Sequence, residues 1–112
     1  YTFDEKFYKY ILQNRNEKIL MKIDTEGSEL DIVKGAKKSL KFIDGIIFEI
    51  DNLERFDGGC NSYSINKFMS KFNFFPSKTI TSNIVKGKNN KKFINYQDIL
   101  YLRKNINWPL ED

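Results

Sequence analysis

The feature that most constrains the fold is a strand, a helix and a second strand that follow one another between residues 18 and 51. The first strand is a short apolar run at residues 18–23, and the second, at residues 45–51, is β-branched and aromatic. Between them Leu30, Val33 and Leu40 recur at helical spacing, which predicts about three helical turns. Because such crossovers are right-handed, we expect two parallel strands with the helix on one face of the sheet.

The flanking segments continue this alternation. Thr2 and Glu5 form a capping box ahead of a first helix, and apolar residues at helical spacing predict another helix over residues 65–72. Asn73 is the expected left-handed residue at the end of that helix. Strands at residues 78–81 and 98–103 follow without a helical crossover, so we expect them to be antiparallel. We interpret residues 1–112 as a single α/β domain.

Composition excludes several function classes. The chain has no His, and its single Cys60 cannot form an internal disulfide, so imidazole-based zinc sites and Ser-His-Asp or Cys-His catalysis are excluded, and we expect no metal. The net charge is +4, from 19 basic and 15 acidic residues. The only dense basic run lies between Lys86 and Lys92, and a basic nucleic-acid-binding module is the weakest of our alternatives. No apolar run reaches membrane-spanning length and no signal peptide is visible, so we expect a cytoplasmic protein that does not bind membranes.

Five carboxylates follow the two predicted parallel strands: Asp24, Glu26 and Glu29 after the first, and Glu49 and Asp51 at the end of the second. The carboxyl ends of parallel strands share one edge of a sheet, where ligands bind. Asp24 closes its strand and is our candidate for a general base. A structural role for the others, at backbone N–H groups or a helix N-terminus, stays open. Glu49 would be costly to bury without a partner.

The sequence around these carboxylates resembles the signature of a known family. Residues 20–36, LMKIDTEGSELDIVKGA, closely resemble the "Lys-Ile-Asp-x-Glu-Gly-x-Glu" signature of FkbM-type methyltransferases, and residues 2–4 and 46–50 resemble its flanking segments. The resemblance implies a partial Rossmann-like, class I fold that uses S-adenosylmethionine to methylate a hydroxyl of a sugar, glycan or secondary metabolite. Asp24 and Glu26 match the motif's acidic pair and are our catalytic candidates, while Glu29, Glu49 and Asp51 are candidates for the substrate crevice.

The resemblance also implies which part of that fold is present. The chain corresponds to the C-terminal half, with strands in the order 4-5-7-6 and the last strand antiparallel. The glycine-rich loop of the family's first strands lies outside this sequence, so no cofactor-binding residue is assigned and we expect methyl transfer to need more than this chain.

Two further expectations concern partners. A non-catalytic binding module that keeps the half-sheet is the alternative to an enzyme. The strand from Lys18 to Ile23 has an apolar edge without a proline, and such edges pair with other chains. We therefore expect a homodimer through this strand.

Overall fold

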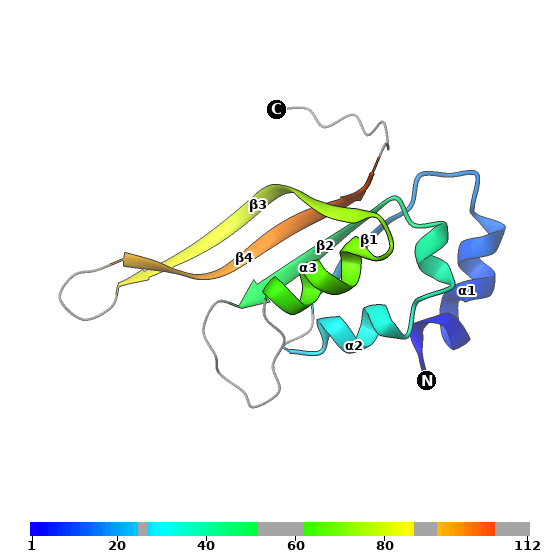
Figure 1. Cartoon of the computed structure of the whole chain (residues 1–112), viewed down its shortest axis with the longest axis horizontal. Helices are drawn as coiled ribbons and strands as arrows, with labels where there is room; N and C mark the ends of the chain where they lie inside the picture. Colours follow the sequence, from blue (N-terminus) through cyan, green and yellow to red (C-terminus); the bar gives the residue numbers. More distant parts are fainter. Residues whose placement is uncertain (25–26, 52–61, 87–91, 105–112) are drawn as a thin grey trace.

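The computed structural model describes residues 1–24, 27–51, 62–86 and 92–104, and within them helices and strands alternate (Figure 1). The chain is a small mixed α/β domain. In order, its elements are α1 (Phe3–Gln13), β1 (Leu20–Ile23), α2 (Glu29–Lys34), the 3₁₀ helix η1 (Ser39–Lys41), β2 (Gly45–Asp51), α3 (Ser62–Ser70), β3 (Phe74–Lys86) and β4 (Lys92–Arg103).

The four strands form one mixed sheet in the order β1-β2-β4-β3. β1 and β2 are parallel, with Ile23 opposite Phe48, which confirms the predicted strand, crossover and strand. β4 is antiparallel to both β2 and β3, so the antiparallel pairing of the last two strands is also confirmed. β1 and β3 are the edge strands of this sheet.

One face of the sheet carries the buried core. Ile46 and Phe48 of β2 are fully buried and cluster with Ile11 of α1, Val33 of α2 and Met69 of α3. All three helices therefore pack on the same side of the sheet. Side chains alternate along a strand, so Ile47 and Glu49 point to the opposite face.

The predicted three-turn helix is shorter in the structure, because α2 ends at Lys34 and only a 3₁₀ turn follows. The start of α1 causes the break. The backbone N–H of Asp4 donates to the Gly35 carbonyl at 2.9 Å, and a Cβ on Gly35 would lie 3.1 Å from that of Thr2. The Asp4 carboxylate accepts hydrogen bonds from the backbone N–H groups of Lys38 and Ser39 at 2.8 and 3.0 Å. Because these N–H groups donate to Asp4, they do not continue the hydrogen bonding of an α-helix.

The last two strands are longer than the sequence predicts. β3 and β4 pair from Phe74 opposite Arg103 to Lys86 opposite Lys92, whereas β2 pairs with β4 only as far as Asp51 opposite Tyr96. The far end is therefore a two-stranded arm (Figure 1). Pro76 is tolerated because β3 is an edge strand, where one side of the backbone needs no partner. Asn73 has a φ of 64°, which confirms its left-handed conformation.

Asp4 offers a test of this packing. We expect Asp4→Ala to lower the free energy of unfolding by about 2 kcal/mol, because two backbone donors and the Ser39 hydroxyl lose a charged acceptor. Urea denaturation followed by circular dichroism measures the change. Glu17→Ala, at an exposed position, serves as the control and should change stability by less than about 0.5 kcal/mol. Equal effects of the two substitutions would contradict the role of Asp4.

The edge strand β1 allows a test of whether two chains pair through it. Leu20 of β1 and Ile80 of β3 are each 46% exposed and lie on opposite edge strands of the sheet. We expect the chain to form dimers through β1 in analytical ultracentrifugation at high concentration, and Leu20→Lys to shift it toward monomer because the lysine must be desolvated at the new interface. Ile80→Lys should leave the dimer intact. A monomer at every concentration would contradict pairing through β1.

Candidate functional site

Asp24 and Glu49 lie side by side at the end of the parallel strand pair. Ile23 is opposite Phe48 in the register of β1 and β2, so the next residues along each strand are Asp24 and Glu49. Their side chains share a hydrogen bond. Asp24 is exposed and Glu49 is half-buried. Because Ile23 and Phe48 point into the core, alternation places both carboxylates toward the sheet face that the helices leave uncovered.

This contact changes the acidity of Glu49. The hydrogen bond with Asp24, followed by burial and by the charge of Asp24, raises the pKa of Glu49 to about 7 from an ordinary 4.5. Two carboxyl groups in such close contact cannot both ionise easily, so the pair holds a proton near neutral pH. A proton shared in this way belongs to the pair, not to one residue. The site can therefore accept or release a proton in the neutral range.

A third carboxylate, Asp98, joins the pair from β4 and was missed by the sequence analysis. It lies directly opposite Glu49 in the antiparallel register, so both side chains point to the same face. Its negative charge further raises the pKa of Glu49. The sequence places Asp98 at the start of a strand, but only the register between β2 and β4 brings it to Glu49.

Glu29 approaches the same group from α2. It is the first residue of that helix, only 5% exposed, and its charge contributes to the raised pKa of Glu49. The N-terminal turn of a helix favours a carboxylate, which agrees with the structural role left open for this residue. Glu29 also has interaction partners of its own. The structure thus brings together Asp24, Glu29, Glu49 and Asp98, named here the carboxylate cluster.

Other predicted residues are placed less completely. Glu26 lies outside the described residues. Asp51 is the last residue of β2, opposite Tyr96, and its side chain is not among those described. Lys86 and Lys92 end β3 and begin β4, and the residues between them lie outside the described part of the chain, as does Cys60.

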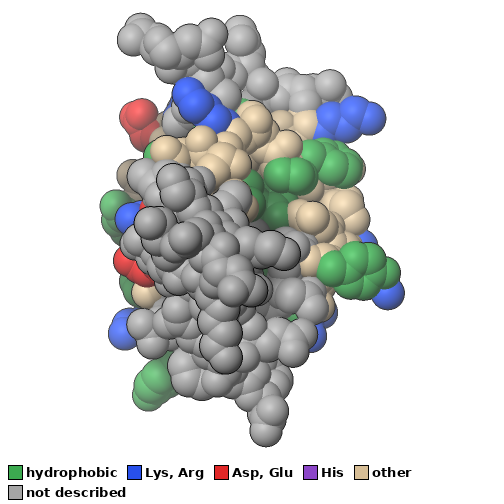
Figure 2. All heavy atoms as spheres, turned by 90° about the vertical axis from the view of Figure 1, so that its left-hand side faces the viewer, with side chains coloured by type: hydrophobic (Ala, Val, Ile, Leu, Met, Phe, Trp, Pro, Cys, Tyr) green, Lys and Arg blue, Asp and Glu red, His purple; other side chains and the backbone are tan. Residues whose placement is uncertain are grey.

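No group of three or more Cys, His, Asp or Glu side chains in the described ranges has an arrangement that would hold a metal ion. Figure 2 looks onto the end of the molecule that carries the arm, and the described Lys and Arg side chains are scattered around this view with acidic ones among them. This face thus lacks a single basic patch among the side chains that are described.

The Methyltransferase FkbM domain model matches residues 1–92 of the 112-residue chain. The chain belongs to the FkbM methyltransferase domain family. The match covers β1, β2 and all three helices, and it ends at the first residue of β4. A search of curated proteins and a search of solved structures found no match. The family resemblance predicted from residues 20–36 is therefore confirmed by the match.

Family membership gives the carboxylate cluster a context. In this FkbM domain the cluster takes one residue each from the end of β1, the start of α2, β2 and β4. The family is one of methyltransferases, so the domain is assigned to that class of enzyme. Among the described helices, none is long and apolar enough to cross a bilayer.

The raised pKa of Glu49 predicts a pH dependence of stability. The folded chain holds this proton up to about pH 7, whereas the unfolded chain releases it near pH 4.5, so the folded state binds more protons between these values. The free energy of unfolding should therefore fall as the pH rises from about 4.5 to about 7. Glu49→Gln should remove this part of the pH dependence, whereas Glu17→Gln, at an exposed position, should retain it.

Urea denaturation at a series of pH values, with NMR titration of the Glu49 carboxyl carbon, measures both quantities. In Asp24→Asn the Glu49 carboxyl should titrate at lower pH, because the neighbouring negative charge is gone. A Glu49 carboxyl that titrates near pH 4.5 in the unmodified chain would contradict the coupling.

Proposed function

We propose that this domain belongs to an S-adenosylmethionine-dependent O-methyltransferase that acts on a hydroxyl of a sugar, glycan or secondary metabolite. The observation that carries the proposal is the carboxylate pair at the end of β1 and β2, with a pKa of about 7 on Glu49. The order β1-β2-β4-β3, with β4 antiparallel, supports the equation of these strands with strands 4-5-7-6 of a Rossmann-like methyltransferase.

The pair suits the removal of a proton from an alcohol. Bound S-adenosylmethionine supplies an electrophilic methyl group on a sulfonium sulfur. When the acceptor oxygen forms its bond to that methyl carbon, the carbon–sulfur bond breaks and the hydroxyl proton must leave. The pair accepts it when both carboxylates are ionised, because the proton is then held with the pKa of about 7 given for Glu49, and a base that titrates near neutral pH is the kind that general-base catalysis favours.

The carboxylate cluster also fits the charge of the methyl donor. Asp98 and Glu29 add negative charge next to the pair, from β4 and from α2. A sulfonium cation is attracted to such a group, and the attraction is strong where the surroundings are partly desolvated, as they are at Glu49. Asp24, as the exposed member, is the one that an acceptor reaches first, so we assign it the contact with the acceptor hydroxyl.

Calorimetric titration with S-adenosylmethionine, and with S-adenosylhomocysteine as the ligand that lacks the sulfonium charge, tests this proposal. We expect saturable binding of S-adenosylmethionine that weakens about tenfold in Asp24→Asn, because its sulfonium loses one neighbouring negative charge, whereas the affinity for S-adenosylhomocysteine should change little. Asp31→Asn removes the same charge from an exposed position of α2 and should leave the affinity unchanged. Absence of binding to this chain, or equal weakening by both substitutions, would contradict recognition of the cofactor by the carboxylate cluster.

A further inference from the structure

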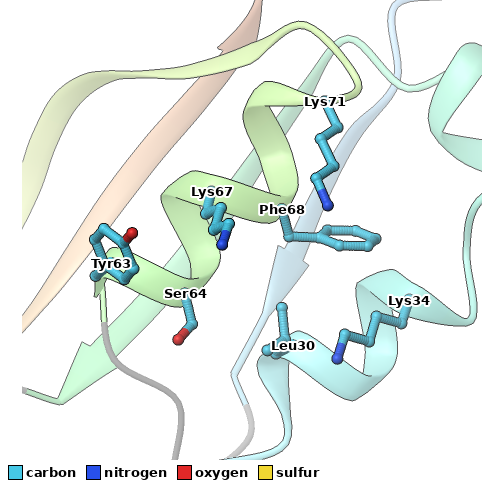
Figure 3. A pocket seen from close by; sticks show the side chains of 7 residues that line it. All are labelled: Leu30, Lys34, Tyr63, Ser64, Lys67, Phe68 and Lys71. Atoms are coloured by element: carbon cyan, nitrogen blue, oxygen red, sulfur yellow. The ribbon is translucent and has the colours of Figure 1, made fainter.

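A cavity of about 270 Å³ lies between α2 and α3, on the helix-covered side of the sheet. Three lysines line it: Lys34 from α2, Lys67 from α3, and Lys71 from the turn after α3. Figure 3 shows Lys67 reaching from α3, Lys71 from the turn that follows it, and Lys34 along α2, toward the space between the two helices. We call this cavity the lysine groove. None of the residues that line it belongs to the carboxylate cluster.

The positive charges of the lysine groove lack a counter-ion within the described residues. No carboxylate in the described parts of the chain forms an ion pair with Lys34, Lys67 or Lys71. Asp31, the exposed carboxylate of α2, is not among the residues that line the groove. Lys67 on α3 and Lys71, in the turn that directly follows α3, are four residues apart, so their like charges repel. A bound anion would relieve this repulsion.

The floor of the groove is apolar. Leu30 and Phe68 are half-buried, pack against the core and line the cavity. Tyr63 lies at the start of α3, lines the groove and is 70% exposed. A few placed polar groups around an apolar floor are typical of small-molecule sites, and the volume is close to the lower end of their usual range. The face of an aromatic ring also suits the C–H groups of a sugar ring.

We propose that the lysine groove binds a small phosphorylated ring compound, of the sugar phosphate class. The phosphate lies among Lys34, Lys67 and Lys71, and the ring lies over Phe68 and Leu30. Lysine ammonium groups bind phosphate as point charges with several donors each, so these three hold one phosphate without the rigid geometry that arginine requires. The inference does not rest on methyl transfer, since it uses residues outside the carboxylate cluster.

Glucose 6-phosphate is the probe for the test, with inorganic phosphate and glucose as reference ligands, at low ionic strength. Calorimetry gives the affinity, and two-dimensional NMR of the amide groups maps the site. We expect saturable binding of glucose 6-phosphate that is at least tenfold tighter than that of either reference ligand. The largest amide shifts should fall on residues 30–34 and 63–71.

Paired variants separate the groove from general positive charge. Lys67→Gln with Lys71→Gln should weaken binding at least tenfold, whereas Lys9→Gln with Lys41→Gln, at exposed positions on α1 and η1, removes the same charge and should not. All four substitutions are at exposed sites, and the amide spectrum reports whether each variant remains folded.

Three outcomes would overturn the proposal. These are the absence of saturable binding, equal weakening in the two double variants, and amide shifts confined to other parts of the chain. A fourth outcome that would overturn it is measured with vesicles of phosphatidylcholine and phosphatidic acid. Binding to these vesicles without binding to glucose 6-phosphate would mean that the lysines serve a membrane surface instead. Because none of these readouts depends on S-adenosylhomocysteine, failure here is distinguishable from failure of the proposed methyl transfer.

Discussion

The parallel register of β1 and β2 is the constraint on which the candidate site depends. Ile23 and Phe48 are paired, and both are buried against the helices. Alternation then directs Asp24 and Glu49, one residue further along, to the other face and next to each other. A shift of one residue in this register would bury a carboxylate and expose Phe48, so the core that stabilises the sheet also fixes the acidic pair.

The helices and the last strand hold that register through contacts between distant parts of the chain. Asp4 joins the start of α1 to the segment after α2, through the N–H groups of Lys38 and Ser39. From the other side, the half-buried guanidinium of Arg103 on β4 donates to the carbonyls of Leu40 and Ile43, and its Cζ lies 5.4 Å from the centroid of the Phe74 ring. The segment between α2 and β2 is thus held from both ends of the chain. This fixes where β2 begins and which residues pair with β1.

Short sequence patterns predicted the parts of the fold that depend on interactions between residues near one another in the sequence. The apolar run before Asp24, the capping box at Thr2 and the left-handed Asn73 each follow from short-range sterics or hydrogen bonding, and each is present. The end of α2 was not predictable in the same way, because hydrogen bonds from Asp4 interrupt an otherwise helical pattern. Asp98 was missed for a related reason, since its contact with Glu49 depends on the register of two strands separated by α3 and β3.

The carboxylate cluster opposes the stability of the sheet that carries it. Like charges directly opposite one another on neighbouring strands are destabilising, and Glu49 faces Asp98 on one side and Asp24 on the other. Nothing in the packing of the core requires acidic residues there, because these side chains point away from it. The cost is reduced when one proton is retained, which is what the raised pKa of Glu49 describes. Departures from local stability rules are concentrated at functional sites, and a pKa near neutral pH is the property that a general base working there needs. The same repulsion that weakens the strand pair therefore supplies its proposed chemistry.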